Sequence, residues 1–171
     1  LDIIAAGIRK IVCLTEHVPV QDTMYFLAAA RERGAQVIGP NTAGLVTTGV
    51  SLVGFMPAFN ARVFQPGDIG VISRSGSLGT LLCLNLVQAG LGVSSFVGIG
   101  GDPIIGTTTR DALVALDRDP ATKAIALVGE IGGAMELKEL PFVVGVLGDF
   151  AGKPEDPLPG VKHRKFVEVD R

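Results

Sequence analysis

Two segments of this sequence carry residue types that bind anions or hold a reacting group. The first, Ser73-Arg74-Ser75-Gly76-Ser77-Leu78, follows an apolar run and opens a helical pattern. At such a junction the first backbone N–H groups of the helix lack acceptors, and the positive end of the helix dipole lies beside them. Because Gly76 removes side-chain bulk while Ser75 and Ser77 add hydroxyls, we predict a phosphate or anion cradle at these three residues. The alternative, an ordinary serine-capped helix, fits the hexapeptide equally well.

The second segment is Gly129-Glu130-Ile131-Gly132-Gly133, which follows another apolar run. A carboxylate at the end of a buried strand is costly without a partner, and this edge of an open α/β sheet is where ligands bind. Glu130 is suited to accept the ring N–H of a histidine, which leaves the other ring nitrogen nucleophilic. A helix N-cap acid and a solvated loop charge are the alternatives, and we favour the functional interpretation.

Three further groups follow strand-like runs: Leu14-Thr15-Glu16, Asn41-Thr42 and Asp102 within Gly98–Pro103. Asparagine tolerates turn geometry and bonds its own backbone, and glycines make tight turns. The residues alone therefore favour structural turns at all three places.

The cysteines and histidines carry weaker signals. Cys13 and Cys83 stand alone in apolar surroundings, which predicts two reduced thiols and a cytoplasmic location. His17 and His163 have no potential metal ligand at a suitable spacing, so we predict no metal site.

Short apolar runs alternate with helical patterns and glycine-rich turns, which predicts an α/β fold with a parallel sheet covered on both faces. The expected strands are 11–14, 36–38, 68–73, 94–99, 122–128 and 142–147, and the expected helices are 21–33, 75–89 and 107–117. Residues 42–67 lack a helical period and read as an irregular connection, and 135–140 as a stub of helix.

Composition excludes several function classes. The chain has 171 residues, 47% of them hydrophobic, with 15 basic against 17 acidic side chains. A nucleic-acid binder would show a basic excess, and the longest apolar runs fall far short of the ~20 residues of a membrane helix. We therefore expect neither partner. Because the sequence opens with Leu1, we also expect it to be part of a longer polypeptide.

Five motifs, in this order and spacing, resemble those of the succinyl-CoA synthetase α-subunit family: GPNTAG, SRSGSL, GIGGDP, GTTTRDAL and GEIGG. The resemblance covers about residues 1–135, and related acyl-CoA synthetases, malate–CoA ligase and ATP citrate lyase share the pattern. It implies that residues 1–60 are the C-terminal part of a Rossmann-like CoA-binding domain. Residues 61–171 would then be a flavodoxin-like CoA-ligase domain with a parallel sheet.

The resemblance also implies a reaction, in which succinyl-CoA is made from succinate, CoA and ATP or GTP through a phosphohistidine. A partner β subunit would hold the nucleotide with Mg²⁺, and the acid would be a short dicarboxylate. By this resemblance, the phosphoryl group would be held by Ser75, Gly76 and Ser77, and the histidine would be oriented by Glu130. CoA would be contacted by Leu14, Thr15 and Glu16. The reacting thiol would lie near Asn41 and Thr42.

Three departures from the family pattern keep alternatives open. The family's Gly-His-Ala-Gly-Ala loop is absent after 142–147, where Phe150-Ala151-Gly152-Lys153 stands instead. A Gly-rich CoA loop is also absent, and Thr80 aligns with the family's succinate-contacting tyrosine. The alternatives are a ligase for another short acid such as malate, a non-catalytic CoA- or anion-binding relative, and a structural partner subunit.

Overall fold

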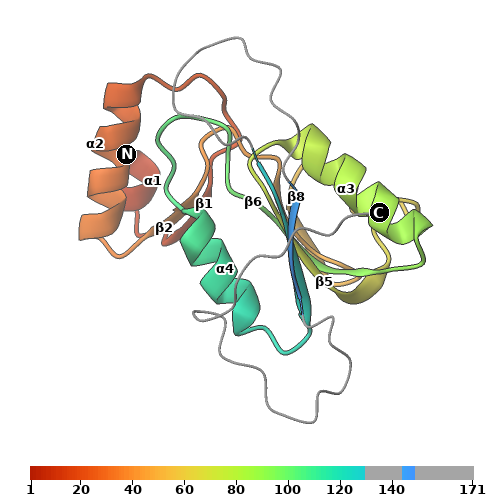
Figure 1. The fold of residues 1–171 in the computed structure, drawn as a ribbon. Helices are drawn as coiled ribbons and strands as arrows, with labels where there is room; N and C mark the ends of the chain where they lie inside the picture. Colours follow the sequence, from red (N-terminus) through yellow and green to blue (C-terminus); the bar gives the residue numbers. More distant parts are fainter. Residues whose placement is uncertain (130–143, 149–171) are drawn as a thin grey trace.

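The computed structural model describes residues 1–129 together with the backbone of residues 144–148. Strands alternate with helices along the chain, which confirms the predicted α/β class (Figure 1). The helices are α1 (Asp2–Ala5), α2 (Val20–Glu32), α3 (Gly76–Gln88) and α4 (Thr109–Asp117). The strands are β1 (Lys10–Val12), β2 (Gln36–Ile38), β3 (Gly44–Thr47), β4 (Ser51–Gly54), β5 (Pro66–Ser73), β6 (Val93–Gly98), β7 (Ala124–Val128) and β8 (Val144–Gly148).

The elements β1, α2 and β2 form a small βαβ unit with its own sheet. The two strands pair in parallel, with Ile11 opposite Val37. Ala30 of α2 and Val37 of β2 form the buried centre of this unit together with Ile4 of α1, which packs against it. Gly34 follows α2 at φ +66, a left-handed conformation that glycine adopts without strain and that commonly ends a helix.

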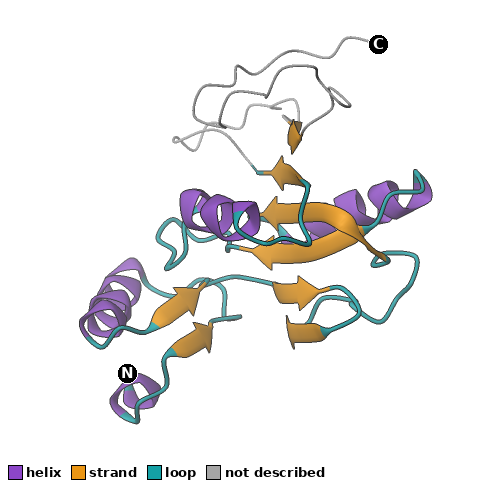
Figure 2. Cartoon of the chain, turned by 90° about the horizontal axis from the view of Figure 1, so that it is seen from below, coloured by secondary structure: helices purple, strands orange, loops and turns teal. Residues whose placement is uncertain are grey.

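The larger sheet has six strands in the order β4-β3-β6-β5-β7-β8, and Figure 2 shows it as a group separate from β1 and β2. Parallel pairing joins β6 to β5 and β5 to β7. The flanking pairs, β4 with β3, β3 with β6 and β7 with β8, are antiparallel. The predicted parallel arrangement is therefore confirmed for the three central strands, which carry the crevice described below.

The expectation of an irregular connection over 42–67 is wrong, because β3 and β4 form a hairpin there and β3 extends the large sheet. Each strand has only four residues, and glycines stand at the open end of the hairpin. Gly44 pairs with Gly54, and a Cβ on either would collide with backbone of the opposite strand. The glycines that looked like loop signals are thus the residues that allow this close pairing.

Helices α3 and α4 cover opposite faces of the large sheet (Figure 1). Adjacent residues of β5 point to opposite faces, so Val71 packs on the α3 side with Phe96 and Cys83, and Ile72 packs on the α4 side with Leu116. This confirms the predicted two-sided cover. A central strand buried on both faces fixes the position of its carboxyl end, where the candidate site lies.

Strand β8 was expected from the apolar run 142–147 and is present, but it runs antiparallel to β7. An antiparallel neighbour does not require the crossover that a parallel strand needs. The predicted stub of helix at 135–140 lies outside the described residues. The division of the chain into domains at residue 60 stays a prediction.

Candidate functional site

The carboxyl ends of the three parallel strands meet at one edge of the large sheet. Ser73, the last residue of β5, pairs with Gly98 of β6 on one side and with Val128 of β7 on the other. The segments that follow these strands, which are the start of α3, the loop 99–108 and Gly129, therefore lie side by side. Such an edge is the usual ligand-binding crevice of an open α/β sheet.

The start of α3 has the geometry of the predicted cradle. Ser75 is the N-cap, and its Oγ accepts from the N–H of Leu78 at 3.4 Å and lies 3.2 Å from Oγ of Ser77. The buried hydroxyl of Ser73 donates to the carbonyl of Ser75 at 2.6 Å, which holds the turn before the helix. As the first two helical residues, Gly76 and Ser77 have no intrahelical acceptor for their N–H groups. The helix therefore presents amides and two hydroxyls to the crevice.

Gly76 also brings this helix start against the segment that precedes β3. A Cβ on Gly76 would lie 2.8 Å from Cβ of Ala43, closer than carbon atoms pack. The neighbouring Thr42 is buried, and its Oγ1 donates to the carbonyl of Gly98 and accepts from the N–H of Gly44. Its hydroxyl is thus used inside the protein and fixes the backbone beside the cradle.

Asn41 joins the small unit to the large sheet. It has φ +57, a conformation that asparagine tolerates better than most residues. Its N–H donates to the carbonyl of Thr15 at 2.8 Å, and its carbonyl accepts from the N–H of Gly101 at 3.0 Å. Its side-chain Nδ2 donates to Oδ1 of Asp102 at 3.0 Å. The structure therefore brings together two predicted places, the exposed segment 14–16 and Asn41, that are separated in the sequence.

Two further residues of this crevice are Arg74, which was assigned no role above, and Asp102, which was expected to lie in a structural turn. Nη2 of Arg74 donates to the carbonyls of Gly101 and Asp102 at 3.2 and 2.9 Å. The side chain of Arg74 also lies beside Gly129, since a Cβ built on this glycine would be 3.7 Å from Cγ and Cδ of Arg74. Arg74 thus spans the ends of all three parallel strands. Its place between a buried strand and the Ser-Gly-Ser turn was the only signal in the sequence.

Other predicted residues stand apart from this arrangement. Glu130 lies outside the described residues, as does His163. His17 is exposed, at φ +57, just beyond the segment 14–16. Thr80 donates to the carbonyl of Gly76 at 2.7 Å, so its hydroxyl bonds its own helix. Within residues 1–129 no three potential ligands among His, Cys, Asp and Glu are grouped to hold a metal ion.

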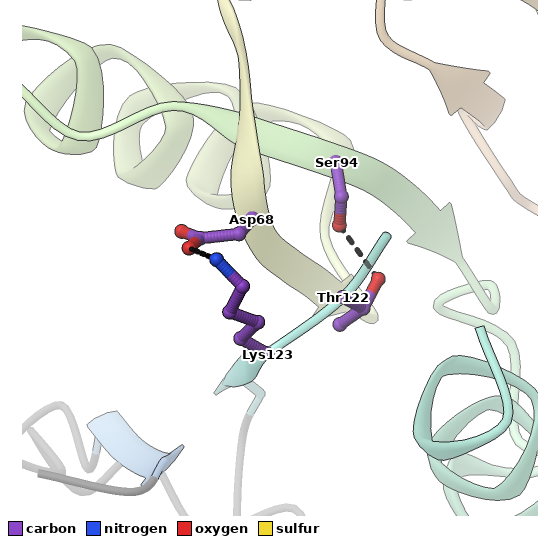
Figure 3. Close-up of polar contacts among 4 residues, drawn as sticks. All are labelled: Asp68, Ser94, Thr122 and Lys123. Atoms are coloured by element: carbon purple, nitrogen blue, oxygen red, sulfur yellow. Dashed lines mark hydrogen bonds and ion pairs between the residues drawn. The ribbon is translucent and has the colours of Figure 1, made fainter. Parts of the chain in front are cut away.

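The opposite edge of the sheet carries polar contacts of a different kind. Figure 3 shows Asp68 paired with Lys123, at 3.1 Å, and the Ser94 and Thr122 hydroxyls 2.7 Å apart. These residues lie near the amino ends of β5, β6 and β7, where they link neighbouring chain segments. No helix in the described part of the chain is long and apolar enough to cross a bilayer.

Among the described residues, Cys83 and Asp111 have shifted pKa values, and neither side chain bonds the residues of the cradle. Burial raises the pKa of the Cys83 thiol to about 12, so it stays protonated in the core under α3. Hydrogen bonds from the Thr108 side chain and backbone lower the pKa of Asp111, which completes a capping box at the start of α4.

Two protein families match parts of this chain. Residues 66–135 match the family described as succinyl-CoA ligase like flavodoxin domain. Residues 120–171 match the family described as type VI secretion system, VipA, VC_A0107 or Hcp2, so the two matches overlap over 120–135. The match at 66–135, together with CoA-ligase-type structural neighbours, confirms the flavodoxin-like fold of the crevice-bearing part.

Curated relatives match over most of the chain. It is 45% identical over 162 residues to the ADP-forming succinate–CoA ligase α subunit 2 of Archaeoglobus fulgidus, covering 92% of this chain and 55% of the relative. It is 41% identical to the malate–CoA ligase α subunit of Methylorubrum extorquens, covering 81% of this chain and 47% of the relative. The chain thus spans about half the length of the curated relatives that it matches.

Among solved structures, the ATP citrate lyase of Methanothrix soehngenii in complex with citrate and coenzyme A is 30% identical, with a TM-score of 0.64. The match covers 73% of this chain and 21% of that one. This similarity in fold agrees with the sequence matches to the curated relatives.

Proposed function

We propose a function for this chain from its membership of the succinate–CoA ligase α-subunit family, to which its homologues and its flavodoxin-like domain assign it. It is the CoA-binding and phosphoryl-binding subunit of an acid–thiol ligase that forms a nucleoside diphosphate. The relatives named as ADP-forming support ADP as the product. A β subunit would supply the site for Mg-ATP or Mg-GTP, and the enzyme would act in the cytoplasm.

One observation carries the proposal: Asn41 links the proposed CoA segment to the edge that holds the proposed phosphate cradle. Its N–H bonds Thr15, and its carbonyl and side chain bond the loop after β6. Two residues later Ala43 contacts the position where Gly76 opens α3. A reaction in which a thiol displaces phosphate from an acyl phosphate needs these two groups at one place, because positioning supplies much of the rate.

The proposed roles follow from what each group exposes. Leu14, Thr15 and Glu16 are exposed and would contact CoA. The N–H groups of Gly76 and Ser77, with the hydroxyls of Ser75 and Ser77, would hold the phosphoryl group by preorganised donors, the mode on which phosphoryl transfer depends. Asn41 and the backbone fixed by Thr42 would lie near the thiol. Glu130 would orient a phosphorylated histidine, a role that rests on the family resemblance.

The acid is proposed as succinate, with malate as the second candidate. Three relatives at 43–46% identity are named succinate–CoA ligase α subunits, and one at 41% is named for malate. Thr80, in place of the family's tyrosine, bonds the carbonyl of Gly76 and leaves more space beside the cradle than a tyrosine would. Extra space is compatible with an acid that carries one more hydroxyl.

A second candidate is a non-catalytic CoA- or anion-binding relative. Residues 120–171 match a secretion-system family over the stretch where the phosphohistidine loop is expected. In that case the cradle and the CoA segment would bind ligands without the relay.

The test uses the intact polypeptide with a candidate β subunit. With ATP, CoA and succinate we expect ADP release that requires all three. The rate of ADP release with malate, compared with the rate with succinate, identifies the preferred acid. Labelled ATP should give an acid-labile, base-stable phosphoryl label on the α chain. CoA binding without any ADP release or label would select the non-catalytic relative, and absence of CoA binding would reject both.

A further inference from the structure

We infer that Asp102 is a positioning residue that fixes the side-chain amide of Asn41 with its carbonyl oxygen available to a hydrogen-bond donor of the CoA pantetheine arm. This inference rests on the proposed function and adds to it the residue that orients the thiol-bearing ligand. Neither residue is assigned a covalent step.

The orientation of the Asn41 amide follows from the chemistry of its partner. A carboxylate only accepts hydrogen bonds, so the group that faces Oδ1 of Asp102 at 3.0 Å must be the NH₂ of Asn41. Oδ1 of Asn41 then points to the other side of the amide, and no donor reaches it from the described residues. A neutral asparagine at position 102 would permit either orientation, because its amide can both donate and accept.

The loop that carries Asp102 is held by independent contacts. Arg74 donates to the carbonyls of residues 101 and 102, and the N–H of Gly101 donates to the carbonyl of Asn41. A Cβ on Gly101 would lie only 3.1 Å from Nδ2 of Asn41. The amide is thus enclosed by a loop that the crevice arginine anchors.

Burial shows that a carboxylate at this position has a cost. Asp102 is 7% exposed, and its Oδ2 is buried without a hydrogen-bond partner in the described part of the chain. An unpaired buried carboxylate oxygen is unfavourable, and an asparagine would make the same contact to Asn41 with less desolvation. What asparagine would not provide is the single amide orientation, so orientation is the property that explains the aspartate.

The ligand group that this geometry fits is a donor. The pantetheine arm of CoA offers amide N–H groups and a terminal S–H, and both can donate to an amide carbonyl. Because the backbone N–H of Asn41 bonds Thr15, the amide lies next to the segment proposed to contact CoA. Either group would donate a hydrogen bond to Oδ1 of Asn41. Desulfo-CoA keeps the amides and lacks the thiol, so it distinguishes the two donors.

The experiment is a calorimetric titration of the intact polypeptide, with its β subunit, using CoA and desulfo-CoA. Asp102→Asn should weaken CoA binding about twofold, because an Asn41 amide free to take either orientation presents its carbonyl oxygen about half of the time. Asn41→Ala should weaken it about tenfold, the worth of one net hydrogen bond, and the double variant should be no weaker than Asn41→Ala, because Asp102 acts through Asn41. Asp111→Asn, the same change at an exposed helix cap that makes no hydrogen bond to Asn41, Arg74 or Asp102, is the matched control and should bind CoA normally.

A merely structural role would give a different pattern. It would lower the thermal midpoint of Asp102→Asn, weaken phosphate binding as much as CoA binding, and add to the effect of Asn41→Ala. Either of these two binding results would overturn the inference, as would unchanged CoA affinity.

If Asp102→Asn does not fold, Arg74→Lys loosens the same loop and should weaken CoA binding more than phosphate binding. Loss that is equal for CoA and desulfo-CoA assigns the amide, and loss for CoA alone assigns the thiol. Failure of the unaltered protein to bind CoA would instead reject the proposed function.

Discussion

The proposed cradle makes opposite predictions for stability and for phosphate binding when a negative charge is placed at Ser77. This residue is exposed, lies in the first turn of α3, and within the described residues its hydroxyl lies within hydrogen-bond distance of one side chain, that of Ser75. The first turn of α3 contains no acidic residue. Ser77→Asp therefore adds a favourable interaction with the helix dipole, while the same charge stands where a phosphoryl group is proposed to bind. Ser77→Asn is the matched control, since it has the same shape without the charge.

The two effects have different sizes. An acid in the first turn stabilises a helix by about 0.3–1 kcal/mol. For a chain of 171 residues this corresponds to a rise of about 1–3 °C in the thermal midpoint. Two unit charges about 4 Å apart repel by about 4 kcal/mol at an effective dielectric constant of 20, and solvent at an exposed site reduces this to about 1 kcal/mol at most. A phosphate group carries close to two charges, so the repulsion is about 1–2 kcal/mol. Phosphate affinity should then fall roughly tenfold.

The assay is the reverse reaction of the intact enzyme, in which acyl-CoA, ADP and inorganic phosphate give ATP, CoA and the free acid. We expect Ser77→Asp to raise the KM for phosphate about tenfold, with unchanged KM for ADP and an unchanged or higher thermal midpoint. Ser77→Asn also loses the Ser77 hydroxyl but adds no charge, so it should raise the KM for phosphate less than Ser77→Asp does. A Ser77→Asp enzyme that is more stable and binds phosphate normally would show that the helix is capped by serine for stability alone, and the cradle would be rejected.

Three further predictions concern the scaffold. Gly79→Ala places a Cβ into the Phe96 ring and should lower the free energy of unfolding in urea by about 1–3 kcal/mol. An unchanged urea midpoint would contradict this packing. Thr108→Ala should cost about 1 kcal/mol at neutral pH. Because the lowered pKa of Asp111 stabilises the fold above its unfolded pKa, that loss should shrink as the pH falls through the folded pKa, and a pH-independent loss would refute the coupling. Cys83, with a pKa of about 12, should resist a thiol reagent until the chain unfolds, and rapid native labelling of both cysteines would contradict its burial.

Local patterns in the sequence predicted the elements whose signals are local. The strand that ends before α3 and the helices α2, α3 and α4 all arise from residues within a few positions of one another. The hairpin of β3 and β4 was missed for the opposite reason. Its strands have four residues each, and its stability comes from pairing with β6, whose partner residues are about 50 positions away. No short-range period can report such pairing.

The candidate site divides in the same way. The Ser75–Ser77 turn was visible because a strand, a glycine and a helix follow one another directly. Asp102 was noticed only as an acid near glycines, since its partner Asn41 is 61 positions earlier. Arg74 carried no signal beyond its position, because its acceptors are main-chain carbonyls, and main-chain groups are the same in every sequence.

The contacts of Asn41 imply that the two halves of the proposed site do not vary independently. Its N–H is bound by the small unit, while its carbonyl and amide are bound by the loop after β6. That loop is anchored by Arg74, the residue directly before the cradle. A substitution at Arg74 would therefore reach the CoA segment through three successive contacts: from Arg74 to the loop, from the loop to Asn41, and from Asn41 to Thr15. Thr80 lies within α3, and its hydroxyl bonds Met56 and the carbonyl of Gly76, so a change there would leave the hydrogen bonds of Asn41 and Arg74 in place.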